Sequence, residues 1–375
     1  MDKILQLMGD IRVSEFFEIN AHTGNYRVVF EKDVMHYLAR DVDKIAHLII
    51  DKNVMSLYQK RLQPILLQAA SVLCIETAES AKSLEQLPEY VKFLTAHQLR
   101  RDHRLIAIGG GVVQDITCFL AATILRGVKW CFYPTTLLAQ ADSCIGSKSS
   151  LNCGDIKNIL GTFTPPEKVI IDVLFLDTLK KCDLQSGMGE MLKVHAIDSP
   201  QAFDKIAQDY HAIFEDRALM IKYIRRSLEI KKYYIEIDEF DRHERNVMNY
   251  GHSFGHAIES ATYYKIPHGI AVSMGMDMAN YISPQLKLGR KDTYLRMHDI
   301  LNENYNDFRD IDISTIRFFE ALSKDKKNLG QQALALILPD EQGRIGKHIC
   351  NDSKVVYEIC LQYFKHMTLE KINIG

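Results

Sequence analysis

The chain has 375 residues, of which 47% are hydrophobic and 25% are charged, and its formal net charge is -2. A chain of this length and composition predicts a globular protein with two domains of ordinary size. The near-neutral charge, without a block of like charges, argues against a nucleic acid or a membrane surface as the main partner. We therefore expect a small-molecule substrate.

The first 17 residues are amphipathic and include acidic side chains. They lack the basic, then apolar, then small-residue order of a secretory signal. No apolar run reaches the roughly 18 residues that a membrane span requires. These features predict a cytoplasmic protein. The eight cysteines include no C-x-x-C pair and mostly occur in apolar segments, which favours buried thiols over disulfides or a cysteine-bound metal.

From about residue 46 to 173, short β-rich runs alternate with longer amphipathic segments, a pattern typical of a parallel sheet with crossover helices. The expected strands are "AHLIID", "SVLCIE", "RLIAIGGG", "KWCFYPTT" and "KVIIDV", and the expected helices lie in "VMSLYQKRLQPILLQ" and "SLEQLPEYVKFLTAHQL". Ligands of such sheets bind beyond the carboxyl ends of the strands. The polar segments that follow the strands, "DKNV", "AESAKSL" and "PTTLLAQADS", could therefore reach a ribose and phosphates.

Three glycines, residues 109 to 111, follow the strand "RLIAI" and lead into the helical run "ITCFLAATIL". Glycines there let the backbone approach a pyrophosphate at a helix N-terminus. Gln114 stands where the usual dinucleotide pattern has its third glycine. A tight turn without a ligand explains the glycines equally well, so this motif alone does not decide between the two interpretations.

Beyond about residue 175 the strand pattern stops and long helical segments follow, apart from one apolar run, "QALALILP". We expect an α/β, Rossmann-like NAD-binding domain over residues 1–174 and a mainly α-helical, metal- and substrate-binding domain over residues 175–375. Sites in such two-domain proteins commonly occupy the cleft between the domains.

His252 and His256 are four residues apart in "NYGHSFGHAIE", so they share one face of a helix. Zinc-binding helices with this spacing carry a glutamate directly after the first histidine, but Ser253 follows here. His268 begins another helical run after Pro267, and "SGMGEMLKVHAI" places Glu190 and Lys193 on one helix face. A glutamate with two histidines is the composition of a catalytic zinc site. Spacing alone does not decide which two histidines bind the metal.

These motifs together resemble the sugar phosphate cyclase family, and within it most closely the 3-dehydroquinate synthases. The resemblance runs in order from about residue 40 to 340 through "GGGVVQD", "RG", "PTTLLAQADSCIGSK", "DIKNILGTFTPPEKVIID", "GMGEMLK", "DEFDRHERNVMNYGHSFGHAIE", "HGIAVSMGM" and "KDKKNLG". It implies the dehydroquinate synthase-like fold, a homodimer, and one site that uses NAD and zinc, with cobalt as an alternative metal.

The resemblance also implies roles for individual residues. The metal ligands would be Glu190, His252 and His268, and catalytic side chains would be Asp142, Lys148, Lys193, Asn249 and His256. The substrate would contact Asn158, Lys231, Arg245 and one of Lys326 or Lys327, with Arg126 lent across the dimer interface. The NAD contacts would be Asp51, Asn53, Glu79, Lys82, Gly110, Gly111, Asp115, Thr135, Thr136 and Lys157.

The implied reaction converts 3-deoxy-D-arabino-heptulosonate 7-phosphate to 3-dehydroquinate and phosphate by NAD-mediated oxidation, β-elimination, reduction and aldol closure. Ser147, Cys118 and Ala78 stand where the family's dehydroquinate synthases usually have glycine, which indicates a divergent branch. Two alternatives remain open. One is a cyclase for sedoheptulose 7-phosphate or glucose 6-phosphate, and the other is a related metal- and NAD-dependent polyol or glycerol-phosphate dehydrogenase. The pathway, shikimate or a secondary-metabolite branch, is open as well.

Overall fold

The computed structural model describes residues 15–154, 156–324 and 333–374, with side chains as far as residue 367. The chain divides into a first unit, Met1–Thr135 with Cys144–Thr178, and a second unit, Thr136–Ser143 with Leu179–Gly375. This division differs from the expected boundary between residues 174 and 175 in two ways. The turn Val173–Thr178 stays with the first unit, and the π-helical segment η3 (Ala139–Ser143) belongs to the second because it packs on helices of that unit.

The first unit is built on a seven-stranded sheet with the order β1-β2-β9-β6-β5-β3-β4. All neighbouring strands are parallel except the edge pair of β1 and β2. The strands are β1 (Glu15–Ile19), β2 (Tyr26–Phe30), β3 (Ala46–Asp51), β4 (Ser71–Ile75), β5 (Arg104–Gly109), β6 (Lys129–Pro134) and β9 (Lys168–Ile171). The five predicted strands are confirmed. The β1–β2 hairpin lies before the segment in which we expected strands.

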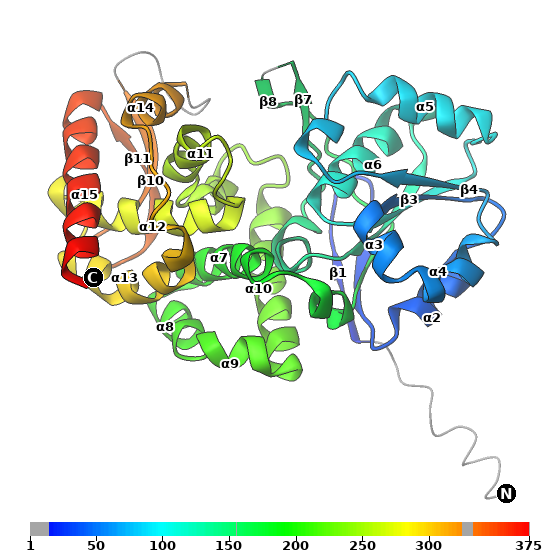
Figure 1. Ribbon diagram of the computed structural model, residues 1–375, viewed down its shortest axis with the longest axis horizontal. Helices are drawn as coiled ribbons and strands as arrows, with labels where there is room; N and C mark the ends of the chain where they lie inside the picture. The colour runs from blue at the N-terminus through cyan, green and yellow to red at the C-terminus, as the bar shows by residue number, and fades with distance from the viewer. Residues whose placement is uncertain (1–14, 155, 325–332, 375) are drawn as a thin grey trace, which may run out of the picture. The chain divides into compact units, whose positions relative to one another are not determined.

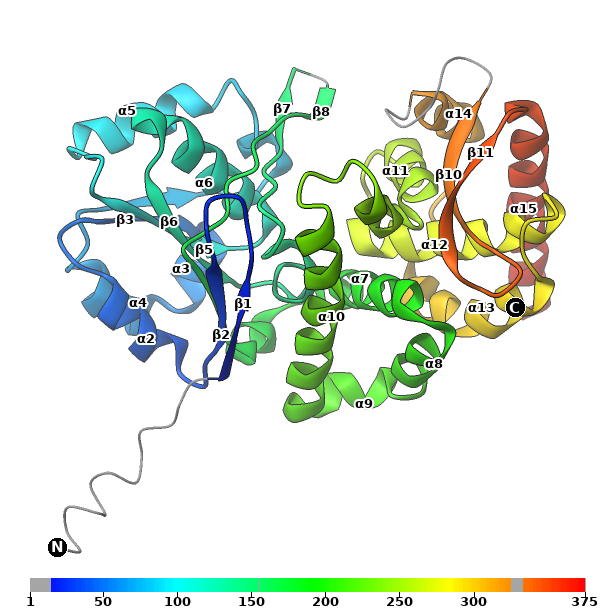
Figure 2. The same cartoon turned by 180° about the vertical axis from the view of Figure 1, so that it is seen from behind.

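Helices cover both faces of this sheet, with α2, α3 and α4 on one side and α5 and α6 on the other (Figures 1 and 2). Their bounds are α2 (Val34–Asp41), α3 (Lys52–Leu57), α4 (Gln59–Leu66), α5 (Leu87–Ala96) and α6 (Gly111–Thr123). The expected helix over residues 54–68 is split at Tyr58, whose backbone (φ -108°, ψ 16°) ends α3 and precedes α4. Buried aliphatic side chains of α2, α4, β3 and β5 form one core cluster.

A small antiparallel hairpin, β7 (Leu151–Cys153) and β8 (Ile156–Leu160), also belongs to the first unit. Single-residue bridges join Ser83 to Asn152 and Lys148 to Phe163. The hairpin therefore ties the segment after β4 to the polar segment that precedes β9.

The second unit is mainly helical, as predicted. Its helices are α7 (Lys181–Asp198), α8 (Pro200–Gln208), α9 (Tyr210–Glu215), α10 (Arg217–Ile237), α11 (His252–Ala261), α12 (His268–Gln285), α13 (Lys291–Tyr305), α14 (Thr315–Ser323) and α15 (Ser353–Ile374). The apolar run before residue 340 forms β10 (Leu334–Pro339), which is buried throughout and pairs with β11 (Ile345–Cys350). The apolar run is thus one strand of a hairpin, and its partner β11 was not expected because apolar and polar residues alternate along it.

No helix in the described segments has the length and apolar character needed to cross a membrane. No disulfide joins the eight cysteines, all of which lie in described segments. Four of them are buried, namely Cys118, Cys131, Cys144 and Cys360, whereas Cys74 is exposed. The prediction of burial is right for half of them.

Candidate active site

The glycine turn after β5 leaves its helix N-terminus open to a ligand. β5 ends at Gly109, and α6 begins at Gly111 with Gly110 as its N-cap. A Cβ added at Gly109 would meet Val113 at 2.6 Å, so this glycine is needed for packing. A Cβ at Gly111 would have no atom within 4 Å. The turn therefore combines a packing requirement with open space at the positive end of a helix, which suits the phosphates of NAD.

A hydrogen-bonded cluster surrounds Lys82 in the first unit. Lys82 Nζ donates to Asp115 Oδ2 at 3.0 Å and to Asn158 Oδ1 at 2.9 Å, and Ser150 N donates to Asp115 Oδ1 at 2.9 Å. Burial raises the pKa of Asp115, and the charge of Lys82 opposes that shift. The cluster brings together Lys82 and Asp115, both expected at NAD, with Asn158, which was expected at the substrate.

The other residues expected at NAD have local partners as well. Asp51 caps α3 by accepting from Asn53 N at 2.6 Å and Val54 N at 3.4 Å. Glu79 accepts from Asn152 Nδ2 at 2.9 Å, and Lys157 Nζ lies 3.9 Å from its carboxylate. Thr135 is buried in the first unit, while Thr136 lies in the segment that belongs to the second unit. The capping of α3 is by itself a sufficient reason for an aspartate at position 51, without a contact to NAD.

Two loops of the first unit hold expected substrate residues in unusual backbone conformations. Leu125, Arg126 and Gly127 all have positive φ, at 52°, 65° and 124°. Ser147, directly before Lys148, has φ 66°. A positive φ strains a non-glycine residue, but several residues outside the expected site share it, so the conformation is compatible with a binding role and does not indicate one. The left-handed backbone also explains why a glycine would suit position 147.

In the second unit, glycines let α7, α11 and α12 approach one another closely. A Cβ on Gly189 of α7 would lie 2.0 Å from the Gly269 carbonyl oxygen. One on Gly269 of α12 would lie 1.8 Å from the Ser186 carbonyl oxygen, and one on Gly251, before α11, 2.7 Å from the Val272 carbonyl oxygen. These three glycines directly neighbour Glu190, His268 and His252 in the sequence. The same contacts that pack the helices therefore place these three side chains.

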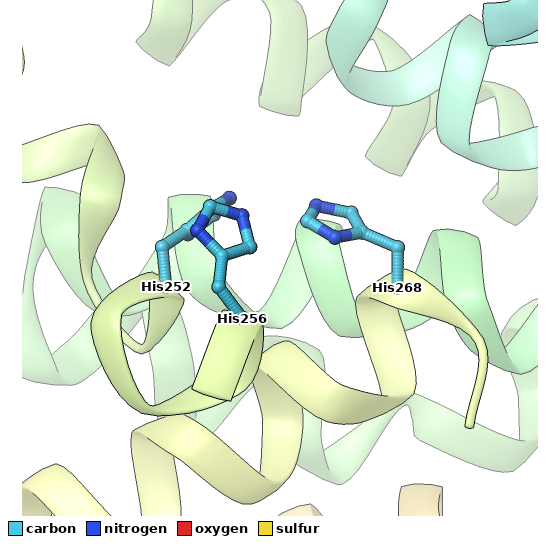
Figure 3. Close-up of side chains that lie close together, drawn as sticks. All are labelled: His252, His256 and His268. Carbon is cyan, nitrogen blue, oxygen red and sulfur yellow. The ribbon is translucent and has the colours of Figure 1, made fainter. Parts of the chain in front are cut away.

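The side chains of Glu190, His252 and His268 converge. Nε2 of His252 lies 3.7 Å and Nε2 of His268 lies 3.2 Å from Glu190 Oε1. His256 joins the group, since ligand atoms of the three histidines all lie within 4.8 Å of one another. Figure 3 shows His252 and His256 rising from α11 and His268 from the start of α12, with their rings turned toward each other. Imidazole nitrogens and a carboxylate oxygen are the donors that zinc prefers.

Glu190 is placed to bind a cation. Its side chain is 1% exposed, and its Oε2 lies 2.5 Å from Lys193 Nζ, so Oε1, near His252 and His268, is the oxygen that would face a metal. Burial would raise the pKa of Glu190, but nearby Lys193 and His268 outweigh burial and lower it. Burial would lower the pKa of His268. The nearby carboxylates of Glu259 and Glu190 outweigh burial and raise this pKa to about 10. This buried ionised carboxylate beside two histidines fits a divalent metal.

Next to Glu190, buried charges alternate in sign. Lys193 Nζ lies 2.5 Å from Glu190 Oε2 and 3.8 Å from Asp142 Oδ1, and Lys231 Nζ lies 3.2 Å from the same Asp142 oxygen. Burial opposes the ionisation of Asp142, but Lys193 and Lys231 keep its pKa below the ordinary value. Lys193, Lys231 and Arg245 are all buried. Three cations thus stand among two carboxylates, which leaves a net positive region suited to an anionic substrate.

The loop that follows α10 fixes the position of Arg245. The carboxylate of Asp238 accepts from the backbone N–H groups of Arg242, His243 and Arg245 at 2.9, 2.7 and 3.2 Å. Arg245 Nη1 donates to the Glu239 carbonyl oxygen at 2.5 Å. Asn249 ends the same loop and donates from Nδ2 to the Asn246 carbonyl oxygen at 3.1 Å. The structure thus brings Asn249 and Arg245 onto one internally bonded loop.

Sequence reasoning missed three polar residues of this region, Ser150, Asp238 and Glu259. Asp238 could have been found as an aspartate just beyond a predicted helix, where it often bonds local N–H groups. Glu259 shares a helix face with His252, seven residues before it. No sequence signal marks Ser150. Lys326 and Lys327 lie outside the described residues.

Solved structures show the fold class. The chain is similar to 2-deoxy-scyllo-inosose synthase complexed with carbaglucose-6-phosphate, NAD+ and Co2+, with TM-score 0.79 and 21% identity over 92% of this chain and 99% of that one. It is similar to 2-epi-5-epi-valiolone synthase from Streptomyces hygroscopicus subsp. jinggangensis 5008 with NAD+ and Zn2+ bound, with TM-score 0.80 and 25% identity over 95% and 99%. A probable glycerol dehydrogenase from Sinorhizobium meliloti 1021 is less similar, with TM-score 0.60 and 12% identity over 95% and 99%. The fold is that of a sugar phosphate cyclase.

Sequence comparison narrows the class. Residues 72–186 match the 3-dehydroquinate synthase N-terminal family and residues 187–328 the 3-dehydroquinate synthase C-terminal family. The 3-dehydroquinate synthase of Clostridium tetani is 36% identical over 293 residues, which cover 75% of this chain and 76% of that protein. That of Streptococcus thermophilus (strain ATCC BAA-491 / LMD-9) is 32% identical over 357 residues, covering 90% and 97%. The chain belongs to the 3-dehydroquinate synthase family.

Proposed function

We propose that the protein is a 3-dehydroquinate synthase, a carbon–oxygen lyase that converts 3-deoxy-D-arabino-heptulosonate 7-phosphate to 3-dehydroquinate and phosphate. Relatives of that name, 32 to 36% identical over most of the chain, support the reaction. The observation that carries the choice of substrate is the buried set of Lys193, Lys231 and Arg245. A substrate with both a carboxylate and a phosphate offers an anionic partner to each end of such a set.

Arg245 is the residue that we assign to the carboxylate. A planar guanidinium can hold a carboxylate through two parallel hydrogen bonds, which a lysine cannot do. Here the bond from Nη1 to the Glu239 carbonyl and the Asp238-bonded loop hold that guanidinium in place before the substrate binds. A cyclase for a substrate without a carboxylate would bury this charge at a desolvation cost of several kcal/mol and gain nothing from it.

We assign Glu190, His252 and His268 to a divalent metal, zinc in the first place, and the glycine turn at Gly110 and Gly111 to NAD. When bound, NAD accepts and returns a hydride, and the metal lowers the pKa of substrate hydroxyls. The chain's own side chains bind and orient the substrate around that chemistry. His256 contacts the phosphate, Asn249 and Lys231 contact the ring hydroxyls and carboxylate, and Asp142 pairs with Lys231 and raises the pKa of Lys193.

Two further assignments stay predictions. We expect a homodimer in which Arg126 acts in the partner subunit's site, and we expect the enzyme in the cytoplasm. The strained loop from Leu125 to Gly127 is compatible with a special role for Arg126.

A substrate panel tests the proposal. Phosphate release is measured with the heptulosonate, sedoheptulose 7-phosphate and glucose 6-phosphate, at NAD well below the product formed. We expect turnover of the heptulosonate with no net NADH. Faster turnover of sedoheptulose 7-phosphate would instead favour the 2-epi-5-epi-valiolone synthase type, and stoichiometric NADH would favour a dehydrogenase.

An arginine variant tests the carboxylate assignment. Arg245→Ala should lower kcat/KM for the heptulosonate roughly tenfold to hundredfold, the equivalent of ~1.5–3 kcal/mol for a charged hydrogen bond, and should retain the metal. The matched control is Arg242→Ala, three residues earlier on the same loop, where the side chain is exposed and lies over Phe240. Equal effects of the two substitutions would contradict the assignment.

A further inference from the structure

We propose that Glu259 is a positioning residue that orients His268 for metal binding. The inference rests on the proposed ligand set of Glu190, His252 and His268, and extends it by a residue that does not itself bind the metal.

The two nitrogens of the His268 ring lie between two glutamates. Nδ1 lies 3.3 Å from both carboxylate oxygens of Glu259, and Nε2 lies 3.2 Å from Glu190 Oε1. An imidazole that donates its Nδ1–H to a carboxylate keeps the Nε2 lone pair available to a metal. Glu259 therefore fixes both the tautomer and the direction in which Nε2 points.

His252 is oriented in a different way. Its Nδ1 lies 3.2 Å from the carbonyl oxygen of Tyr250, and its Nε2 lies 3.7 Å from Glu190 Oε1. A neutral carbonyl close in the chain therefore supports His252, whereas a charged carboxylate from another helix supports His268. Because a carboxylate makes an imidazole a more basic ligand than a carbonyl does, the two histidines should differ in how strongly they depend on their supporting group.

The position of His268 explains why it needs a partner from outside its helix. It is the first residue of α12, its side chain is 35% exposed, and its N-cap residue, Pro267, makes no side-chain capping bond. Glu259 comes from the last turn of α11 and is 13% exposed. It also lies seven residues after His252, on the same face of α11. One helix thus supplies a metal ligand and, two turns later, the group that orients the ligand from the next helix.

The alternative explanation is that Glu259 and His268 form an ion pair that only stabilises the fold. That explanation predicts lower stability for a Glu259 variant and an unchanged affinity of the folded protein for metal. The positioning role predicts instead that the folded variant binds metal more weakly, because removal of such a carboxylate typically weakens metal binding 10- to 100-fold.

The test measures zinc affinity by competition with a chromophoric chelator, using the full-length protein after zinc depletion. Glu259→Ala should bind zinc about 10- to 100-fold more weakly than the natural protein. Glu259→Gln should fall between the two, because its amide oxygen still accepts from Nδ1–H but carries no charge. Glu320→Gln, an exposed glutamate of α14, is the matched control and should bind zinc normally.

The inference is overturned if both Glu259 variants bind zinc within twofold of the natural protein. Glu259→Gln keeps the shape of the side chain and decides the question should the alanine variant fail to fold. His268→Ala separates this inference from the proposed function. If that variant loses zinc while the Glu259 variants keep it, only the positioning role is wrong. If it binds zinc normally, the proposed ligand set fails as well.

Discussion

The two units position their polar residues by different physical means. In the first unit they follow the ends of parallel strands and bond to one another, as Lys82 does with Asp115 and Asn158. In the second unit they project from helices that cross at glycines, and each proposed metal ligand adjoins one of those glycines. The first arrangement thus depends on hydrogen bonds between side chains, whereas the second depends on close backbone packing at glycines.

A pair of glycine substitutions tests this contrast most strongly. In Gly269→Ala the new Cβ would lie 1.8 Å from the backbone oxygen of Ser186, which cannot move without separating α7 from α12. Overpacking costs about 1–3 kcal/mol and occasionally more, and a backbone obstacle puts this case at about 3 kcal/mol. Urea unfolding should show that loss, together with loss of bound metal.

Gly111→Ala is the matched substitution in the first unit, where the new Cβ would meet nothing within 4 Å. We expect unchanged or slightly higher stability, since alanine is the better helix former, with weaker NAD binding measured by fluorescence titration. Equal destabilisation by both substitutions would remove the contrast between the units.

The Lys82 cluster tests whether the first unit depends on its internal pairing. Lys82→Met removes the cation beside Asp115, whose side chain is 18% exposed. Breaking a fully buried pair costs about 3–5 kcal/mol, and partial exposure of Asp115 reduces our expectation to about 2 kcal/mol. Lys129→Met, which breaks the exposed pair with Glu167, is the control and should cost less than about 1 kcal/mol. A larger loss in the control, measured by urea unfolding, would refute this ranking.

A variant of His195 tests whether every buried polar residue of α7 contributes to the metal site. His195 lies on the same helix as Glu190, its Nδ1 bonds to the Met191 carbonyl at 2.8 Å, and its Nε2 has no hydrogen-bond partner in the described segments. Burial lowers its pKa to about 4. Because this folded-state pKa is below the unfolded value of 6.5, stability is present above pH 6.5 and falls as pH falls toward 4.

From pH 6.5 to pH 5 this one residue should cost the natural protein about 1.5 kcal/mol of unfolding free energy. The measurement compares urea unfolding at both pH values with that of His195→Gln, which cannot titrate. The variant should lose that much less stability on acidification and should keep its metal. An equal loss in both proteins would show that His195 does not titrate as its burial predicts.

Much of this account could be predicted from the sequence. Alternation of apolar runs and helices predicted the parallel sheet, and the family resemblance implied that Glu190, His252 and His268 belong to one site. The β1–β2 and β10–β11 hairpins were missed because their partner strands are short or alternate with polar residues. Glu259 and Asp238 were missed for another reason. Their roles come from hydrogen bonds to residues four to nine positions away, which form only when the loop has folded back.

The segment 136–143 shows a further limit of sequence reasoning. It follows β6 directly, and strand order alone assigns it to the first unit. Its π-helical turn instead presents Asp142 to Lys193 and Lys231 of the second unit to which it belongs. Charge pairing between distant parts of the chain, rather than local propensity, decides where this segment packs.

The central claim is that Glu190, His252 and His268, and not His256, hold the metal. Metal analysis of purified His252→Ala, His256→Ala and His268→Ala tests it most directly, since His256 is within 4.8 Å of the other two and makes the fairest control. We predict that His252→Ala and His268→Ala contain little metal, while His256→Ala keeps about one metal per chain and loses turnover. A metal-free His256→Ala protein, together with metal retained in either of the other two variants, would contradict the account.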